Sequence, residues 1–166
     1  HTVVSCERCG FLFVEDPSQN TASEDTVEFD DARHSEVPFP ERRHHYILNL
    51  VEMLFDRNTK VLEIGAGYGT LGKLLQNNGH EYLGFEPSEV RAGVAKNGDV
   101  NIINDVHDPS HVNKEYDTII FDNVLEHVRD PKGIVNNAKV DLKPGGTIIT
   151  IVPSRYDLRR IHPRWN

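Results

Sequence analysis

The sequence contains little cysteine, methionine or tryptophan, with two, one and one residues of each type among 166. Two cysteines do not make the disulfide framework that is found in small secreted proteins. No apolar stretch approaches the roughly 18 residues that suggest a membrane-spanning helix, and the first residues lack the basic and then apolar pattern of a secretion signal. These absences predict a cytoplasmic protein without a membrane partner.

Basic residues are also scarce relative to acidic ones, because 18 lysines and arginines stand against 26 aspartates and glutamates and the formal net charge is −8. Proteins that bind the phosphate backbone of nucleic acids usually present a net basic face. We therefore expect no nucleic-acid partner. The chain is 37% hydrophobic, which is sufficient for the core of one domain.

An apolar run that breaks into three alternating glycines is the most informative part of the chain. Gly65, Gly67 and Gly69 follow residues 61–64, a pattern typical of a buried strand that runs into a turn before a helix. Because glycine lacks a Cβ, a ligand can approach the backbone, and the next helix points free N–H groups at it. The pattern predicts a nucleotide-like ligand. The spacing differs from G-x-G-x-x-G, so a hydride-transferring dinucleotide enzyme fits poorly.

Two further strand ends carry polar residues. Glu86 ends a short apolar strand roughly twenty residues after the glycine loop, where an acid accepts hydrogen bonds from ribose hydroxyls; a surface glutamate is the alternative interpretation. Residues 116–121 form an apolar strand that stops at Asp122 and Asn123. Ligands gather at the carboxyl ends of strands in an open parallel sheet. Both positions are therefore candidate ligand-binding sites.

These motifs together resemble the class I S-adenosylmethionine-dependent methyltransferases. The resemblance includes Glu63 ahead of the glycines, residues 116–128, and the turn at residues 142–146 that enters a fifth strand, and it runs from about residue 46 to residue 153. It implies an α/β fold, a Rossmann-like doubly wound and mostly parallel sheet flanked by helices. It also implies methyl transfer to a small-molecule acceptor. A non-catalytic methyltransferase-like partner subunit and a Rossmann-type NAD oxidoreductase are the alternatives.

The resemblance also implies which residues bind the cofactor. In the family, an acid at the end of the third strand commonly meets the adenine, and a residue on the helix before the first strand approaches the methionine end. Position by position, the implied cofactor-binding residues are Tyr46, Glu63, Gly65, Ala66, Gly67, Gly69, Glu86, Pro87, Asp105, Val106, Asp122, Asn123 and Val124. For Tyr46, the alternative is a solvated basic helix face.

His127 is the candidate catalytic residue. An acceptor that is a hydroxyl, an amine or an acidic C–H must lose a proton, and a histidine near the cofactor is suited to accept one around neutral pH. The alternative is that Glu126 and His127 only cap and pack the turn that follows the fourth strand.

Cys6 and Cys9 form a C-x-x-C-G motif before an apolar strand, as in one half of a zinc ribbon. Tetrahedral zinc needs four ligands, so the others would be histidines such as His1 or His34, or cysteines upstream. A redox pair or inert thiols are the alternatives, and the redox role is disfavoured because no active-site helix follows.

Three segments follow from these motifs. Residues 1–40 are a partial zinc-ribbon-like segment and a linker, residues 41–153 an S-adenosylmethionine-binding methyltransferase domain, and residues 154–166 a basic tail that begins an acceptor-covering segment. The sheet is predicted to be truncated after its fifth strand, where the family adds two more. Since an uncovered edge strand pairs readily with other chains, we expect either self-association or a longer polypeptide. The acceptor and the oligomeric state stay open.

The zinc motif generates the first prediction. A version of the protein that extends upstream of His1 should contain about one equivalent of zinc by elemental analysis. Changing Cys6 and Cys9 to serine should remove the metal, because the thiolates are the strong ligands. A longer protein that is fully folded and free of metal would contradict the prediction.

Overall fold

The computed structural model describes residues 3–5, 7, 12–14, 34–55, 58–109 and 115–153. The chain divides into two compact units, His1–Arg33 and His34–Asn166. In the first unit, strand β1 (Val3–Ser5) pairs antiparallel with β2 (Leu12–Val14). Cys6 and Cys9, the predicted zinc ligands, fall between these strands in the sequence and lie outside the described residues.

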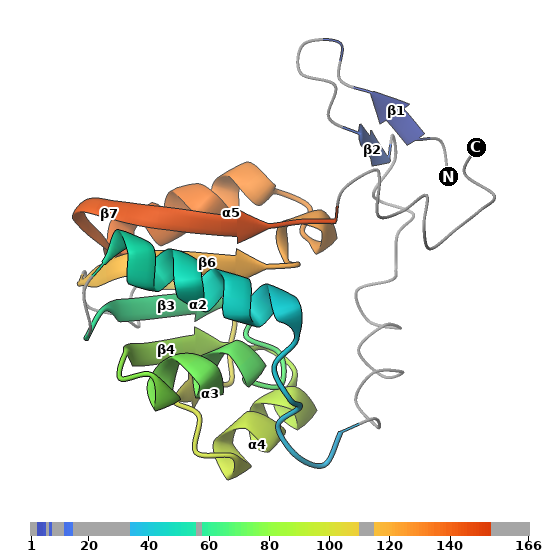
Figure 1. The fold of residues 1–166 in the computed structure, drawn as a ribbon. Coiled ribbons are helices and arrows are strands. Elements are labelled where there is room, and N and C mark those ends of the chain that lie inside the picture. Colours follow the sequence, from blue (N-terminus) through green and yellow to red (C-terminus); the bar gives the residue numbers. More distant parts are fainter. Residues whose placement is uncertain are drawn as a thin grey trace. The chain divides into compact units, whose positions relative to one another are not determined.

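The second unit is built on a parallel sheet of five strands (Figure 1). The sheet has the order β5-β4-β3-β6-β7, and each neighbouring pair is parallel. This order confirms the predicted doubly wound fold. The strands are β3 (Lys60–Ile64), β4 (Glu81–Phe85), β5 (Ile102–Ile103), β6 (Tyr116–Asp122) and β7 (Leu142–Ile151).

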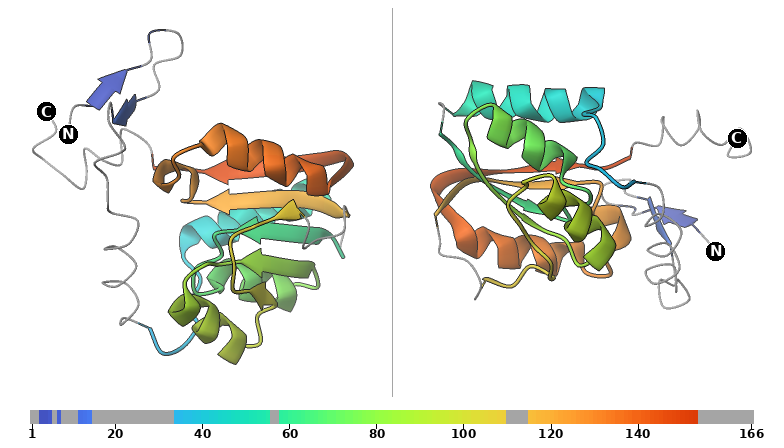
Figure 2. Two further views of the ribbon diagram at one scale, coloured as in Figure 1. Left: turned by 180° about the vertical axis from the view of Figure 1, so that it is seen from behind. Right: turned by 90° about the horizontal axis from the view of Figure 1, so that it is seen from below.

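Helices cover both faces of this sheet (Figure 2). Side chains of α2 (Arg42–Leu54), α3 (Thr70–Asn77) and α4 (Glu89–Asn97) share one core with β3, β6 and β7, while α5 (Pro131–Ala138) belongs to a second core. Successive residues of a strand alternate between the two faces, so Val61 packs in the first core and Leu62 in the second. Among the described residues, no helix is long and apolar enough to cross a membrane.

Local sequence signals account for the helix starts. Ser88 caps α4 by accepting a hydrogen bond from the Arg91 N–H at 3.3 Å. Asp130 caps α5 by accepting from the Gly133 N–H at 2.8 Å, and Pro131 occupies the first helical position. The sequence predicts helices that begin after Ser88 and after Asp130, and the structure confirms both starts.

The predicted and observed elements differ near the end of the domain. The sequence predicts a third strand at residues 100–104, of which only Ile102 and Ile103 form β5. The sequence also predicts a helix from Pro131 to about Leu142, whereas α5 ends at Ala138 and is followed by a 3₁₀ turn, η4 (Lys139–Asp141). The predicted turn at residues 142–146 lies within β7, whose pairing with β6 is irregular between Tyr116 and Thr118.

Residues 34–40, predicted as part of the linker, belong to the second unit. Val37 is partly buried against the core that α2, α3 and α4 share. A Cβ built on Gly98 would lie 2.4 Å from Val37 Cγ2, so the turn after α4 fits closely against this segment. The unit therefore begins before Glu41, because an apolar side chain fixes the entering chain.

Candidate functional site

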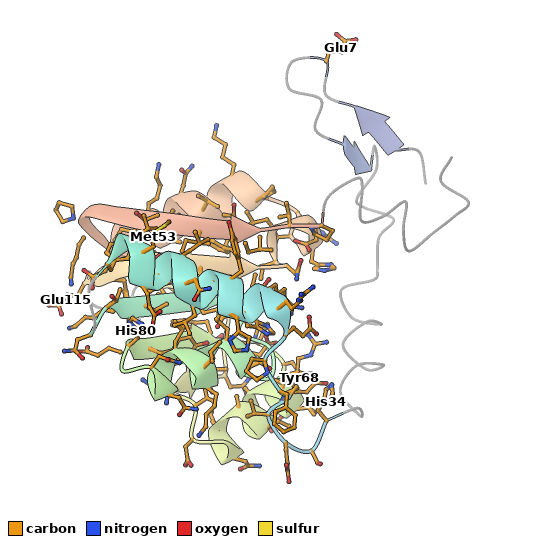
Figure 3. The ribbon with its side chains drawn as sticks, in the orientation of Figure 1. Glu7, His34, Met53, Tyr68, His80 and Glu115 are labelled. Carbon is orange, nitrogen blue, oxygen red and sulfur yellow. The ribbon has the colours of Figure 1, made fainter. Side chains whose placement is uncertain are left out.

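The predicted ligand-binding residues of the strands and their loops gather at the carboxyl ends of the parallel strands. The glycine loop follows β3, Glu86 and Pro87 follow β4, and Asp105 and Val106 follow β5. Figure 3 labels Tyr68 of the glycine loop beside His34 at this end, and His80 and Glu115 at the opposite end. His34 and Tyr68 contact edge to face, with ring centroids 4.8 Å apart.

The glycine loop is fixed by backbone hydrogen bonds to the neighbouring strand. The N–H groups of Gly65 and Ala66 both donate to the Phe85 carbonyl, at 2.8 and 2.9 Å. Gly69 is the N-cap residue of α3 and has φ +77°. The loop therefore turns sharply from β3 into α3 while it stays attached to the end of β4.

The three glycines of the loop differ in what surrounds them. A Cβ on Gly65 would lie 2.4 Å from Val124 Cγ2, and one on Gly69 would lie 2.8 Å from Ala95 Cβ. Gly67 also has a positive φ of +55°, yet a Cβ there would meet nothing within 4 Å. Packing thus excludes side chains at Gly65 and Gly69. At Gly67 the backbone has an open edge, because the space where a Cβ would stand is empty, and a ligand can approach the backbone there.

Glu86 joins the loop to the next helix. Its buried carboxylate accepts a hydrogen bond from the Gly67 N–H at 2.8 Å on one oxygen and from the Ser88 N–H at 2.9 Å on the other. Each carboxylate oxygen has two acceptor positions, so capacity remains for the ribose hydroxyls that the sequence predicts as donors. Glu86 also fixes the position of the loop, a role that the sequence does not indicate.

Glu63 lies buried beneath the loop and pairs with another buried side chain. The Tyr82 hydroxyl donates a hydrogen bond of 2.6 Å to Glu63 Oε2. Burial raises the pKa of Glu63 to about 8, against the lowering effect of the Tyr82 hydrogen bond, and the charges of Asp122 and Glu86 raise it further. The carboxyl group is therefore mostly protonated at neutral pH.

Asp122 connects the end of β6 to α2. Its carboxylate accepts a 2.9 Å hydrogen bond from Arg43 Nε, and His44 Nε2 lies 3.5 Å from the same oxygen. His44 Nδ1 accepts from the Glu41 N–H at 2.9 Å, which leaves the proton of the neutral ring on Nε2. Burial and the neighbouring Arg43 lower the pKa of His44, so the ring is neutral at pH 7.

Arg43 and His44 were not among the predicted site residues. The sequence could have indicated that His44 is buried, because it stands three positions before Ile47 and therefore on the same face of α2. The predicted residue of this helix, Tyr46, is 59% exposed, and the contact between α2 and Asp122 is made by Arg43.

Asp105 and Val106 are exposed and follow the short β5. The Asp105 carboxylate accepts a 2.7 Å hydrogen bond from the N–H of Val106. The side chain of Asn104 donates to the carbonyls of Glu86 and Pro87, at 2.9 and 3.1 Å. The segment predicted to meet the adenine is thus attached to the segment predicted to meet the ribose.

The remaining predicted residues follow β6. Asn123 has a left-handed backbone with φ +55°, and its N–H donates to the Ile151 carbonyl at 2.9 Å. Val124 packs over Gly65. His127 ends the 3₁₀ turn η3 (Leu125–His127) and is exposed. In the described part of the chain, no group of three or more His, Cys, Asp or Glu residues is arranged to hold a metal ion.

The fold and this site define a doubly wound α/β domain with a glycine loop at the point where the strand order reverses, which is where such folds bind their ligands. A family model described as "Methyltransferase domain" matches residues 39–166. The chain belongs to this family, which confirms the resemblance to class I S-adenosylmethionine-dependent methyltransferases.

Individual relatives agree with this assignment. The ubiquinone biosynthesis O-methyltransferase of Coxiella burnetii is 34% identical over 95 residues, which cover 53% of this chain and 41% of the relative. The enzyme of the same name from Serratia proteamaculans is 31% identical over 114 residues, covering 64% and 46%. The chain therefore spans less than half the length of these curated relatives.

Solved structures show the same fold. The N-methyltransferase NodS from Bradyrhizobium japonicum, solved in complex with S-adenosylhomocysteine, aligns with a TM-score of 0.60 and 19% identity, covering 76% of this chain and 70% of NodS. The plantazolicin methyltransferase BpumL aligns with a TM-score of 0.53 and 18% identity, covering 86% and 61%. At these identities the similarity concerns the fold.

The raised pKa of Glu63 predicts how stability changes with pH. In the unfolded chain the pKa of this group is about 4.5, and in the folded protein it is about 8. Between these values the folded state holds one more proton, so its stability falls as pH rises. Glu63→Gln, which mimics the protonated acid, should remove this fall. Relative to wild type, the variant should gain up to about 1.4 kcal/mol per pH unit.

Urea denaturation of both proteins at several values between pH 5 and 8 measures this difference. The other titrating groups are common to both proteins, so their contributions cancel. A difference in unfolding free energy that stays constant over this range would show that Glu63 is ionised in the folded protein.

Proposed function

We propose that the chain binds S-adenosylmethionine and transfers its methyl group to a small-molecule acceptor. The observation that carries the proposal is the open edge of Gly67, which lies beside the acidic side chain of Glu86 at the carboxyl ends of the parallel strands. The acidic side chains of Glu86 and Asp122 near this edge favour a cationic sulfonium ligand over the diphosphate of a nicotinamide dinucleotide. The family assignment supports the same ligand.

Each part of the ligand has candidate partners in the chain. The loop of Gly65, Ala66, Gly67 and Gly69 would lie along the ligand, with Glu86 at the ribose. Asp105 and Val106 would receive the adenine. The proposed set is completed by Tyr46, Glu63, Pro87, the last residue of β6, Asp122, and the two residues after it, Asn123 and Val124.

When bound, S-adenosylmethionine supplies an activated methyl group on a sulfonium, and the main tasks of the protein are alignment and exclusion of water. The rigid attachment of the glycine loop to β4 suits it for alignment. His127 is exposed beyond β6, so its imidazole is available to accept the proton that a hydroxyl acceptor loses. The names of the relatives from Coxiella and Serratia favour an oxygen atom as the methyl acceptor.

Two further features remain proposals from the sequence. Cys6 and Cys9 would hold zinc together with ligands from elsewhere, and the protein would act in the cytoplasm. Neither feature is required for the proposed methyl transfer.

Cofactor binding tests the central proposal. Isothermal titration calorimetry should show that the chain binds S-adenosylmethionine or S-adenosylhomocysteine more tightly than NAD. Gly67→Ala should weaken this binding at least tenfold, because the new methyl group would occupy the open edge that the ligand approaches. The matched control is Gly79→Ala, since Gly79 also has a positive φ of +85° and open space.

The two alanine variants should lose similar stability, about 1–2 kcal/mol for a left-handed non-glycine residue. Gly79→Ala should retain wild-type affinity, because the turn after α3 lies away from the glycine loop. The proposal fails if NAD binds the wild-type chain more tightly than either sulfur ligand.

The proposed base makes a separate prediction. His127→Ala should reduce kcat by about 10²–10⁴-fold with an acceptor that must lose a proton. The melting temperature and the affinity for S-adenosylhomocysteine should stay at wild-type values, because His127 is exposed. Glu126→Ala, at the preceding exposed position, serves as the control and should retain kcat. If kcat is unchanged in His127→Ala, the residue only caps the turn.

A further inference from the structure

His107 and Asp141 form a buried pair that is separate from the predicted ligand-binding residues. His107 Nε2 lies 2.8 Å from Asp141 Oδ2, and both side chains are 0% exposed. His107 follows β5, whereas Asp141 ends η4 directly before β7. Burying an ionisable group costs free energy, and a hydrogen-bonded partner offsets part of that cost. The contact between His107 and Asp141 therefore stabilises both buried side chains.

His107 also packs against the end of β4. Its ring meets the Phe85 ring edge to face, with centroids 5.2 Å apart and an interplanar angle of 89°. The carbonyl of Phe85 accepts the N–H groups of Gly65 and Ala66. The position of the His107 ring is thus fixed against the strand that carries both the glycine loop and Glu86.

The segment that contains Asp105 and Val106 lies between two anchors. On one side, Asn104 donates to the carbonyls of Glu86 and Pro87. On the other side, His107 bonds to Asp141. Because β5 is only two residues long, its ladder holds little of this segment in place. The two anchors therefore determine how the exposed Asp105 is presented.

We propose that His107, through its hydrogen bond to Asp141, is a positioning residue that holds Asp105 and Val106 in the conformation that selects adenine. This inference rests on the proposed function. The 6-amino group of adenine donates a hydrogen bond that a carboxylate can accept. Hypoxanthine has a carbonyl oxygen at the same position, and a carboxylate repels it. The hydrogen bond between His107 and Asp141 thereby contributes to base selectivity without touching the ligand.

The test compares S-adenosylhomocysteine with S-inosylhomocysteine by calorimetry. The wild-type chain should prefer the adenosyl ligand by about ten- to a hundred-fold, the range expected for one hydrogen bond to a charged group. Asp105→Ala should remove most of this preference. The double variant His107→Phe with Asp141→Leu replaces the pair by apolar side chains, a change that buried ion pairs often tolerate, and it should also remove most of the preference.

Combining Asp105→Ala with the double variant should cause little additional loss, because both changes act through the same carboxylate. A purely structural role would lower both affinities by the same factor and leave their ratio intact. The matched control is His80→Phe, since His80 is another buried histidine and lies at the opposite end of the sheet (Figure 3). This control should retain the wild-type ratio.

If the folded double variant keeps the wild-type ratio, the positioning role is wrong even though the proposed function stands. A wild-type chain that binds neither ligand would instead overturn the proposed function and this inference with it. Should the double variant not fold, His107→Phe combined with Asp141→Asn decides, because phenylalanine fills the place of the imidazole without a hydrogen-bond donor and asparagine keeps the shape of the aspartate without its charge. A smaller ratio in that variant supports the role of His107, and an unchanged ratio overturns it.

Discussion

The hydrogen bonds of the Glu86 carboxylate hold the rest of the site together. One oxygen accepts the Gly67 N–H and the other the Ser88 N–H, so a single buried side chain connects the glycine loop, the end of β4 and the start of α4. Leaving a buried N–H without its acceptor costs about 1–3 kcal/mol. The loop therefore has its shape before a ligand arrives, and a preorganised site loses less entropy on binding.

Acidic residues at three neighbouring strand positions behave differently because their surroundings differ. Glu63 is buried against the Tyr82 hydroxyl and retains its proton at neutral pH. Glu86 accepts two backbone N–H groups, and Asp122 faces the guanidinium of Arg43. The sequence identifies all three as acids near a ligand, but it does not show which of them is charged, because burial and partners decide that.

Short sequence patterns predicted the elements whose formation depends on interactions between residues that are close in sequence. The strand at residues 81–85 and the caps at Ser88 and Asp130 are found where the sequence places them, because apolar runs and capping side chains act over a few residues. β5 is shorter than predicted, since only Ile102 and Ile103 pair with β4.

The pairs that the sequence did not reveal join distant parts of the chain. Arg43 and Asp122 are 79 residues apart, and His107 and Asp141 are 34 residues apart. Neither pair belongs to a periodic pattern or a short motif. Such pairs become visible only when the topology has placed the helix and strand ends beside each other, so a single sequence carries no signal for them.

The strand order has a consequence for how the site is assembled. From β3 the chain builds β4 and β5 on one side, and then it crosses to build β6 and β7 on the other. Glu86 belongs to the first half and Val124 to the second, while the two halves meet along the pairing of β3 with β6. A ligand bound between the two halves would contact both of them. Its binding energy would then oppose local opening of the sheet, and the two halves would unfold as one cooperative unit.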